Sequence, residues 1–204
     1  VIFEKLLKED GRRYYNVSPG ENYSQVTETH FTIDPGNKTD FEQLLTVVNI
    51  SEISHIYYFW PVHNNPNNIS ATELCSQVMP FIYLIQACSE SESPVNLVVI
   101  TRGAQCVTND ERLINLNSSS FWGLLPLVEN EFPSIHYKLV DLCSDGPTDK
   151  INEWIHYILD GNINELAIRS GKPHIKKLTQ MPPESDHAEI KAVSVSTAEP
   201  VRII

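Results

Sequence analysis

Short apolar runs alternate with longer amphipathic segments along this chain. The runs at residues 54–60 (SHIYYFW), 96–101 (NLVVIT) and 135–142 (IHYKLVDL) are rich in β-branched and aromatic side chains. Such runs are typical of strands that are covered on both faces. Shorter extended segments are predicted at residues 12–17, 30–34, 165–169 and 174–178.

Helical spacing of apolar positions separates most of these runs. Ser70 is a suitable N-cap for a long helix that ends near Ala87, with Pro80 inside it. Either Thr39 or Asp40 is expected to cap an earlier helix. The full set of predicted helices covers residues 1–9, 39–48, 70–87, 118–130 and 148–160.

This alternation predicts an α/β fold with a mostly parallel sheet, right-handed crossovers and helices on both faces. No internal repeat is evident. After Gln180 the sequence contains Pro182–Pro183 and many charges. We expect this tail to be a linker or an edge strand that leads toward another part of a longer polypeptide, since the chain also opens on Val1 rather than Met.

Composition narrows the classes of partner. Lys and Arg number 15 against 26 Asp and Glu, a formal net charge of −11 over 204 residues. A negative field repels phosphate backbones and anionic lipids, which argues against binding to nucleic acid or to a membrane surface. No apolar stretch is long enough to span a bilayer.

The cysteines favour a reduced, cytoplasmic protein. No two of the four form a C-x-x-C pair, and their spacing matches no common zinc framework. Cys75, Cys88 and Cys143 lie in or beside apolar runs, where a small buried thiol is the ordinary interpretation. Cys106 is the fourth.

Sequence patterns for catalysis or cofactor binding are missing. The eight glycines form neither G-x-G-x-x-G nor a P-loop. None of the eight tyrosines is followed four residues later by Lys or Asn, the pair that would form a reductase dyad. We therefore assign no catalytic, cofactor-binding or metal-ligating residue.

A few polar residues at strand ends are weak candidates for a site. Asp141 ends a strand, where ligands of α/β proteins bind, but a carboxylate that caps loop amides is the more ordinary interpretation. Arg102 follows a strand and is suited to an anion or, more ordinarily, to a surface ion pair. His55 and His63 are expected to be polar strand-end residues rather than metal ligands.

Five sequence blocks carry a family resemblance. They occur in this order: TRGA at 101–104, WGL at 122–124, EFP at 131–133, LVDL at 139–142 and ELAIRSG at 165–171. Their order and spacing resemble the structural subdomain of polyketide synthase ketoreductases, in the short-chain dehydrogenase/reductase family. The resemblance extends from Val1 to about Leu178. It departs from the family at the start, where a strand usually precedes the first helix.

The resemblance implies a truncated Rossmann-like fold and a division of labour between two halves. Residues 1–180 would be the structural subdomain, and 181–204 a linker or edge strand toward the catalytic one. That partner subdomain would bind NADPH and carry the Ser, Tyr and Lys or Asn groups that reduce β-ketoacyl chains on an acyl carrier protein. This fragment would bind no cofactor itself.

Two further expectations concern contacts and alternatives. Candidate contacts with the catalytic half are apolar positions near Phe121, Trp122 and Leu125 and along the strands of 168–178, although each is more often simply core. The alternative function is an independent flavodoxin-like or receiver-like binding module. A receiver needs an acidic cluster, for which the strand ends supply only Asp34 and Asp141.

Overall fold

The computed structural model describes residues 13–63, 70–91, 93–107, 111, 115–144, 157–158, 163–176 and 201–203. The helix predicted over residues 1–9 lies outside these ranges, as does the tail from 177 to 200. Of the helix predicted over residues 148–160, only Tyr157–Ile158 is described, and both residues are helical.

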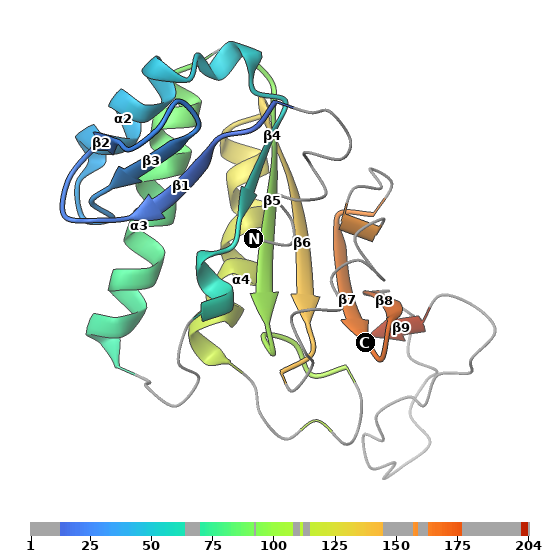
Figure 1. Ribbon diagram of the computed structural model, residues 1–204. Helices are drawn as coiled ribbons and strands as arrows, with labels where there is room; N and C mark the ends of the chain where they lie inside the picture. The colour runs from blue at the N-terminus through green and yellow to red at the C-terminus, as the bar shows by residue number, and fades with distance from the viewer. Residues whose placement is uncertain are drawn as a thin grey trace, which may run out of the picture.

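A six-stranded sheet forms the centre of the molecule (Figure 1), in the order β4-β5-β6-β7-β8-β9. The first four strands run parallel, β8 is antiparallel to β7, and β9 is parallel to β8. The predicted α/β fold with a mostly parallel sheet is thus confirmed. The bounds are β4 His55–Tyr58, β5 Val95–Arg102, β6 Ile135–Leu142, β7 Glu165–Arg169, β8 Lys172–Lys176 and β9 Val201–Ile203.

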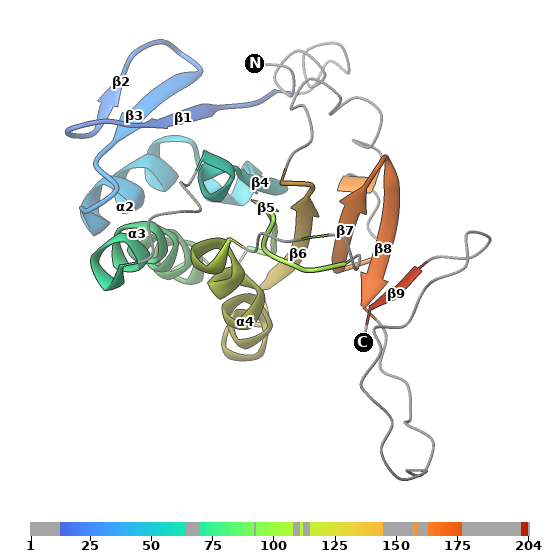
Figure 2. The same cartoon turned by 90° about the horizontal axis from the view of Figure 1, so that it is seen from below.

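Helices α3 (Ala71–Ser89) and α4 (Leu116–Glu131) lie together on one face of this sheet (Figure 2). The predicted cap of α3 is confirmed, because the Ser70 hydroxyl accepts a hydrogen bond from the Glu73 amide at 3.1 Å. α4 begins two residues before its predicted start. Its N-cap is Asn115, whose side-chain oxygen accepts from the Ser118 amide at 3.1 Å.

Alternate residues of the central strands face two separate apolar clusters. Leu97 and Val99 of β5 pack in the cluster beneath α3 and α4. Val98 and Ile100 face the other way and pack with Ile158. Because both faces are covered, β5 needs apolar side chains at consecutive positions, as its sequence indicated. The prediction of helices on both faces is confirmed.

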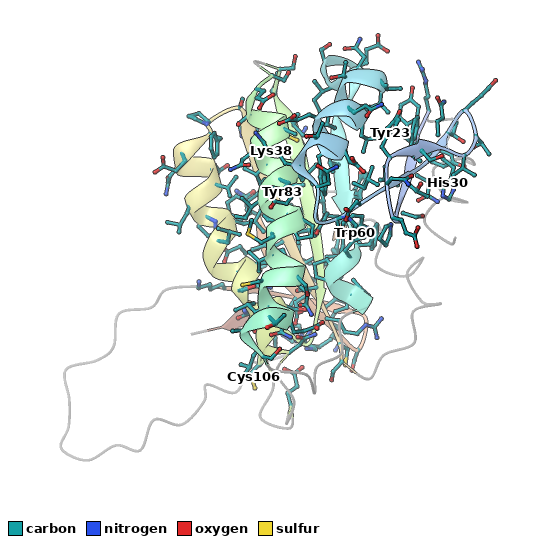
Figure 3. All side chains as sticks on the ribbon, turned by 90° about the vertical axis from the view of Figure 1, so that its left-hand side faces the viewer. Tyr23, His30, Lys38, Trp60, Tyr83 and Cys106 are labelled. Atoms are coloured by element: carbon teal, nitrogen blue, oxygen red, sulfur yellow. The ribbon has the colours of Figure 1, made fainter. Side chains whose placement is uncertain are left out.

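The first strands form a second, smaller sheet instead of joining the main one. β1 (Asn16–Pro19), β2 (Ser24–Gln25) and β3 (His30–Ile33) are arranged in the order β1-β3-β2. The sequence pattern did not indicate that these strands form a sheet of their own. Phe31 and Ile33 are buried in the cluster that also contains Phe41 of α2, so this sheet packs on a helix rather than pairing with β4. Figure 3 views this side, with Tyr23 just before β2 and Tyr83 on α3.

Helix α2 (Lys38–Val47) is capped two or three residues earlier than predicted. Its N-cap is Asn37, whose side chain accepts from the Thr39 amide at 3.1 Å. Asp40 is buried in the first turn and accepts from the Asp34 amide at 2.9 Å. The predicted cap at Thr39 or Asp40 is wrong, because Asp40 stabilises the preceding turn from inside the helix.

Strand β4 lies at the edge of the main sheet, which corrects another prediction. Only Tyr58 of its four residues is fully buried, although the run was expected to be covered on both faces. The aromatic character of the run has a different origin. The Tyr58 ring packs 5.2 Å from that of Phe81 and 5.5 Å from that of Trp60, in the short helix η2 (Trp60–His63) that follows. Another short helix, η1 (Ile50–Glu52), precedes β4.

A buried polar cluster at the strand ends

Three polar side chains meet where β5, β6 and β7 end. Thr101, Asp141 and Arg169 are 0%, 0% and 5% exposed. Parallel strands bring their carboxyl ends to one edge of a sheet, the place where open α/β folds bind ligands. We call this group, completed by Ala104, Gln105, Glu111 and Trp122, the strand-end cluster.

The Asp141 carboxylate is the centre of the cluster. One oxygen accepts from the Thr101 hydroxyl at 2.7 Å and the Ala104 amide at 2.9 Å. The other accepts from the Gln105 amide at 3.1 Å and the Arg169 guanidinium at 2.7 Å. Four donors occupy the lone-pair sites that a carboxylate offers. The interpretation of Asp141 as a cap for loop amides is confirmed.

The loop after β5 is shaped to present its amides to this carboxylate. Gly103 has a φ of 62°, in the left-handed region that glycine enters without steric cost. The amides of Ala104 and Gln105 then both donate to Asp141. Successive amides in such a turn form a concave site for an anion. Here the anion is a side chain of the neighbouring strand, so the loop amides have no donor left for a phosphate.

Arg169 joins the remaining parts of the cluster. Its guanidinium donates to the Asp141 backbone carbonyl at 3.1 Å and to the Gln105 carbonyl at 2.7 Å, and it forms an ion pair with Glu111. Burial on its own lowers the pKa of Arg169, but the carboxylates of Asp141 and Glu111 outweigh it and raise the pKa above its usual value. Arg169 is therefore a charged, fully paired group.

Helix α4 is attached to the cluster by two hydrogen bonds. The Trp122 indole donates to the Thr101 hydroxyl at 3.1 Å, and the Ser119 hydroxyl donates to the Ala104 carbonyl at 2.7 Å. Of the apolar contact candidates on this helix, Phe121 and Leu125 are 0% exposed and belong to the core. Trp122 alone of these three is only partly buried.

The cluster has the properties of a structural site rather than a reactive one. Its carboxylates are held by the Arg169 guanidinium and by loop amides, and its hydroxyl is bonded to Asp141. The Thr101 hydroxyl donates to the Asp141 carboxylate, but both residues are 0% exposed, so no substrate reaches this pair while the cluster is intact. Within the described ranges, no three His, Cys, Asp or Glu side chains are grouped so that they could hold a metal ion. No helix among those described is long and apolar enough to cross a membrane.

The other polar candidates do not join this cluster. Arg102 donates to the Cys143 carbonyl at 3.4 Å. The His55 ring stacks on Tyr57, with centroids 5.9 Å apart and planes inclined by 10°. The side chain of His63 lies outside the described residues.

All four cysteines are free thiols, as expected for a reduced protein. Cys88 is buried, and burial raises its pKa to about 12, so it is unreactive. The prediction of a buried thiol is wrong for Cys75, which is exposed, and Cys143 is half-buried. Cys75 lies on the solvent side of α3, where apolar neighbours in the sequence do not imply burial. Cys106, labelled in Figure 3, is exposed in the loop after β5.

Glu111 is the member of the cluster that the sequence did not reveal. It lies in a polar loop, 58 residues before its partner Arg169. The available signal was Arg169 itself, at the end of the apolar strand ELAIR. A buried arginine needs carboxylate partners, so its position predicts that acidic side chains lie nearby, without saying which ones.

Comparisons with known proteins agree with this architecture. A family model described as the Rossmann fold domain of the polyketide synthase extender module SpnB matches residues 26–178. A multidomain structure with adenylation, ketoreductase and pseudo-Asub domains, from a keto acid-selecting NRPS module, has a TM-score of 0.71 at 21% identity. An N-terminal ketoreductase from the macrolactin assembly line has a TM-score of 0.63 at 16% identity. A C2-type ketoreductase from a modular polyketide synthase has a TM-score of 0.58 at 15% identity.

The aligned regions are most of this chain but a minor part of the others. They cover 84%, 81% and 84% of this chain and 16%, 35% and 41% of those chains, respectively. None of the curated proteins matches. At these identities the solved structures establish a shared fold, while the family model spans more than half of the chain, including β5 to β8. The chain belongs to the family of the Rossmann fold domain of the polyketide synthase extender module SpnB.

Proposed function

We propose that this chain is the structural, non-catalytic subdomain of a polyketide synthase ketoreductase. It supports a catalytic subdomain that uses NADPH to reduce β-ketoacyl chains bound to an acyl carrier protein. In this proposal residues 1–180 form the structural subdomain and 181–204 lead toward the catalytic one. The assembly works in the cytoplasm, beside the other domains of the synthase.

The observation that carries the proposal is the state of the strand-end cluster. A dinucleotide-binding sheet leaves loop amides at its strand ends free for the pyrophosphate. In this chain the amides of Ala104 and Gln105, in the loop after β5, donate to the Asp141 carboxylate, and the Arg169 guanidinium donates to one oxygen of the same carboxylate. The strand ends therefore have a structural task, which suits a half that supports catalysis elsewhere.

The arrangement also disfavours the alternative of an independent flavodoxin-like or receiver-like module. Such a module would use the same strand ends for its ligand or phosphoacceptor. Asp141 is completely buried and holds four hydrogen bonds, so it is not accessible for phosphorylation. A ligand at this edge would have to displace a buried ion pair, which is costly.

The direct test uses a polypeptide in which this chain is joined to the reductase region of its own synthase. With NADPH and a β-ketoacyl thioester, that polypeptide should consume NADPH, while the 204-residue chain alone should not. The catalytic region without this chain should lose most of its activity, because its support is missing. Reduction by the 204-residue chain alone, or full activity without it, would refute the proposal.

A further inference from the structure

A small cavity lies beside the strand-end cluster, on the sheet face that carries α4. It has a volume of about 90 Å³. The residues that line it come from β7, β8, α4 and the loop after β5: Gln105, Trp122, Glu165, Leu166, Ala167, His174 and Lys176. α4 packs mainly on β5 and β6, so the cavity lies where β7 and β8 extend beyond the helix (Figure 2).

His174, which lines this cavity, carries an unsatisfied polar atom. His174 is 9% exposed, and Ala167, which pairs with it across β7 and β8, is 0% exposed. Within the described part of the chain, His174 Nδ1 is the one fully buried side-chain nitrogen or oxygen without a hydrogen-bond partner. Leaving such an atom unpaired costs about 1–3 kcal/mol, so it indicates a partner that completes the site.

The surroundings decide which chemistry that partner has. Burial lowers the pKa of His174, and the positive charges of Arg169 and Lys172 lower it further against the opposing effect of Glu111. The imidazole is therefore neutral near pH 7, and the nearby cations disfavour another positive charge. Glu165 is already engaged by the Tyr137 hydroxyl at 3.0 Å. The missing group is therefore a neutral hydrogen-bonding group, because Nδ1 of a neutral imidazole accepts or donates according to its tautomer.

We propose that this cavity is a docking point for the catalytic reductase subdomain, one of whose hydroxyl or amide side chains enters it and forms a hydrogen bond with His174 Nδ1. The inference rests on the proposed function and adds the contact surface to it. The volume suits one small polar side chain, since it corresponds to roughly three water molecules at about 30 Å³ each. Trp122, partly buried beside the cavity, supplies the kind of aromatic contact that contributes most at protein interfaces.

Two observations favour the rest of a reductase as the occupant. The two matched ketoreductases are much longer, since the aligned region is 35% and 41% of their chains. In addition, β9 belongs to the segment that, in the proposed function, leads toward the catalytic subdomain. β9 pairs with β8 (Figure 1), and Val201 is the register partner of His174, so this segment passes close to the cavity. The rim of the cavity carries Glu165 and Lys176, 3.8 Å apart, and a polar rim around an aromatic contact is typical of interfaces.

The test compares His174 in the 204-residue chain and in the polypeptide that joins this chain to the reductase region. Deuterium exchange at the imidazole C2 position, followed by mass spectrometry, reports access to each histidine. We expect exchange at His174 to slow at least several-fold in the joined polypeptide. His136, whose side chain is 57% exposed at the opposite end of the sheet, is the internal control and should not change. Equal exchange at His174 in both samples, as for a cavity filled by water alone, would overturn the inference.

Two variants of the joined polypeptide separate docking from simple packing. His174→Asn keeps a polar group near the position of Nδ1, whereas His174→Leu removes it. We expect His174→Leu to reduce the rate of NADPH-dependent reduction several-fold and His174→Asn to retain most of it, with both variants folding like the parent by circular dichroism. Equal rates for His174→Leu and the parent would refute the docking point. A joined polypeptide that protects His174 but reduces nothing would refute the proposed function instead.

Discussion

The Asp141 carboxylate accepts four hydrogen bonds within the strand-end cluster. Replacing it with alanine would leave Arg169 buried with one carboxylate fewer, and the Ala104 and Gln105 amides without an acceptor. Removing one partner of a buried ion pair costs about 3–5 kcal/mol. We expect Asp141→Ala to lower the free energy of unfolding by that amount in urea denaturation.

Glu52→Ala is the matched control for this substitution. Glu52 also faces an arginine, Arg13, at 3.7 Å, but both side chains are largely exposed. Exposed ion pairs contribute little, so the change should stay within about 0.5 kcal/mol. If the two alanine variants lost equal stability, the cluster would not hold the strand ends together.

His174 makes the free energy of unfolding of the chain depend on pH. Its pKa in the folded state is lowered from 6.5, chiefly by burial and then by Arg169. As the pH falls below about 6.5, the unfolded chain binds a proton that the folded chain resists, so the free energy of unfolding decreases. His174→Gln removes this titration. The difference between the parent and the variant, measured by urea denaturation from pH 8 to pH 5 (roughly the range of histidine titration), should therefore fall with pH. A constant difference would contradict the lowered pKa.

At the residue scale, the sequence singled out Asp141 of the strand-end cluster but not Glu111. Asp141 stood out because a carboxylate that ends an apolar strand needs polar partners. Glu111 did not, since nothing in a polar loop shows which of its acids will reach Arg169 across 58 residues of chain. The same limit applies to Asp40, where local pattern suggested a cap and the fold uses the carboxylate inside the first turn.

At the element scale, α4 connects the core to the strand-end cluster. Phe121, on its buried side, is 0% exposed and packs edge-on against Phe81 at 5.2 Å. Truncating a buried phenylalanine costs about 3–5 kcal/mol, so Phe121→Ala should lower the urea midpoint strongly. Leu127→Ala on the same helix is the control, because Leu127 is 59% exposed. A similar loss from both variants would mean that α4 is not packed as described.

Strands that are buried and bounded by turn residues were predicted well from the sequence. The bounds of β6 and β7 match the predicted ranges 135–142 and 165–169, because both strands are buried and flanked by turns. Pairing was not predictable in the same way. The HFTI segment of β3 has an ordinary strand pattern, yet it pairs with β1 and β2 in a separate sheet, and only tertiary packing on α2 decides that.

At the scale of the whole molecule, the ends of β5, β6 and β7 are closed by side chains of the chain itself. A sheet that binds a dinucleotide keeps such an edge open, whereas here Asp141, Arg169 and the loop after β5 fill it. This closure supports the proposed function of a structural subdomain, whose proposed docking surface lies beyond α4, along β7 and β8.

The measurement that tests this account most directly is a calorimetric titration of the 204-residue chain with NADPH. If the Asp141 carboxylate occupies the loop amides, the titration should give no saturable binding at up to millimolar NADPH. The joined polypeptide, titrated in parallel, should bind one equivalent. Saturable micromolar binding to the 204-residue chain alone would show that its strand ends are open to a dinucleotide and would contradict the account.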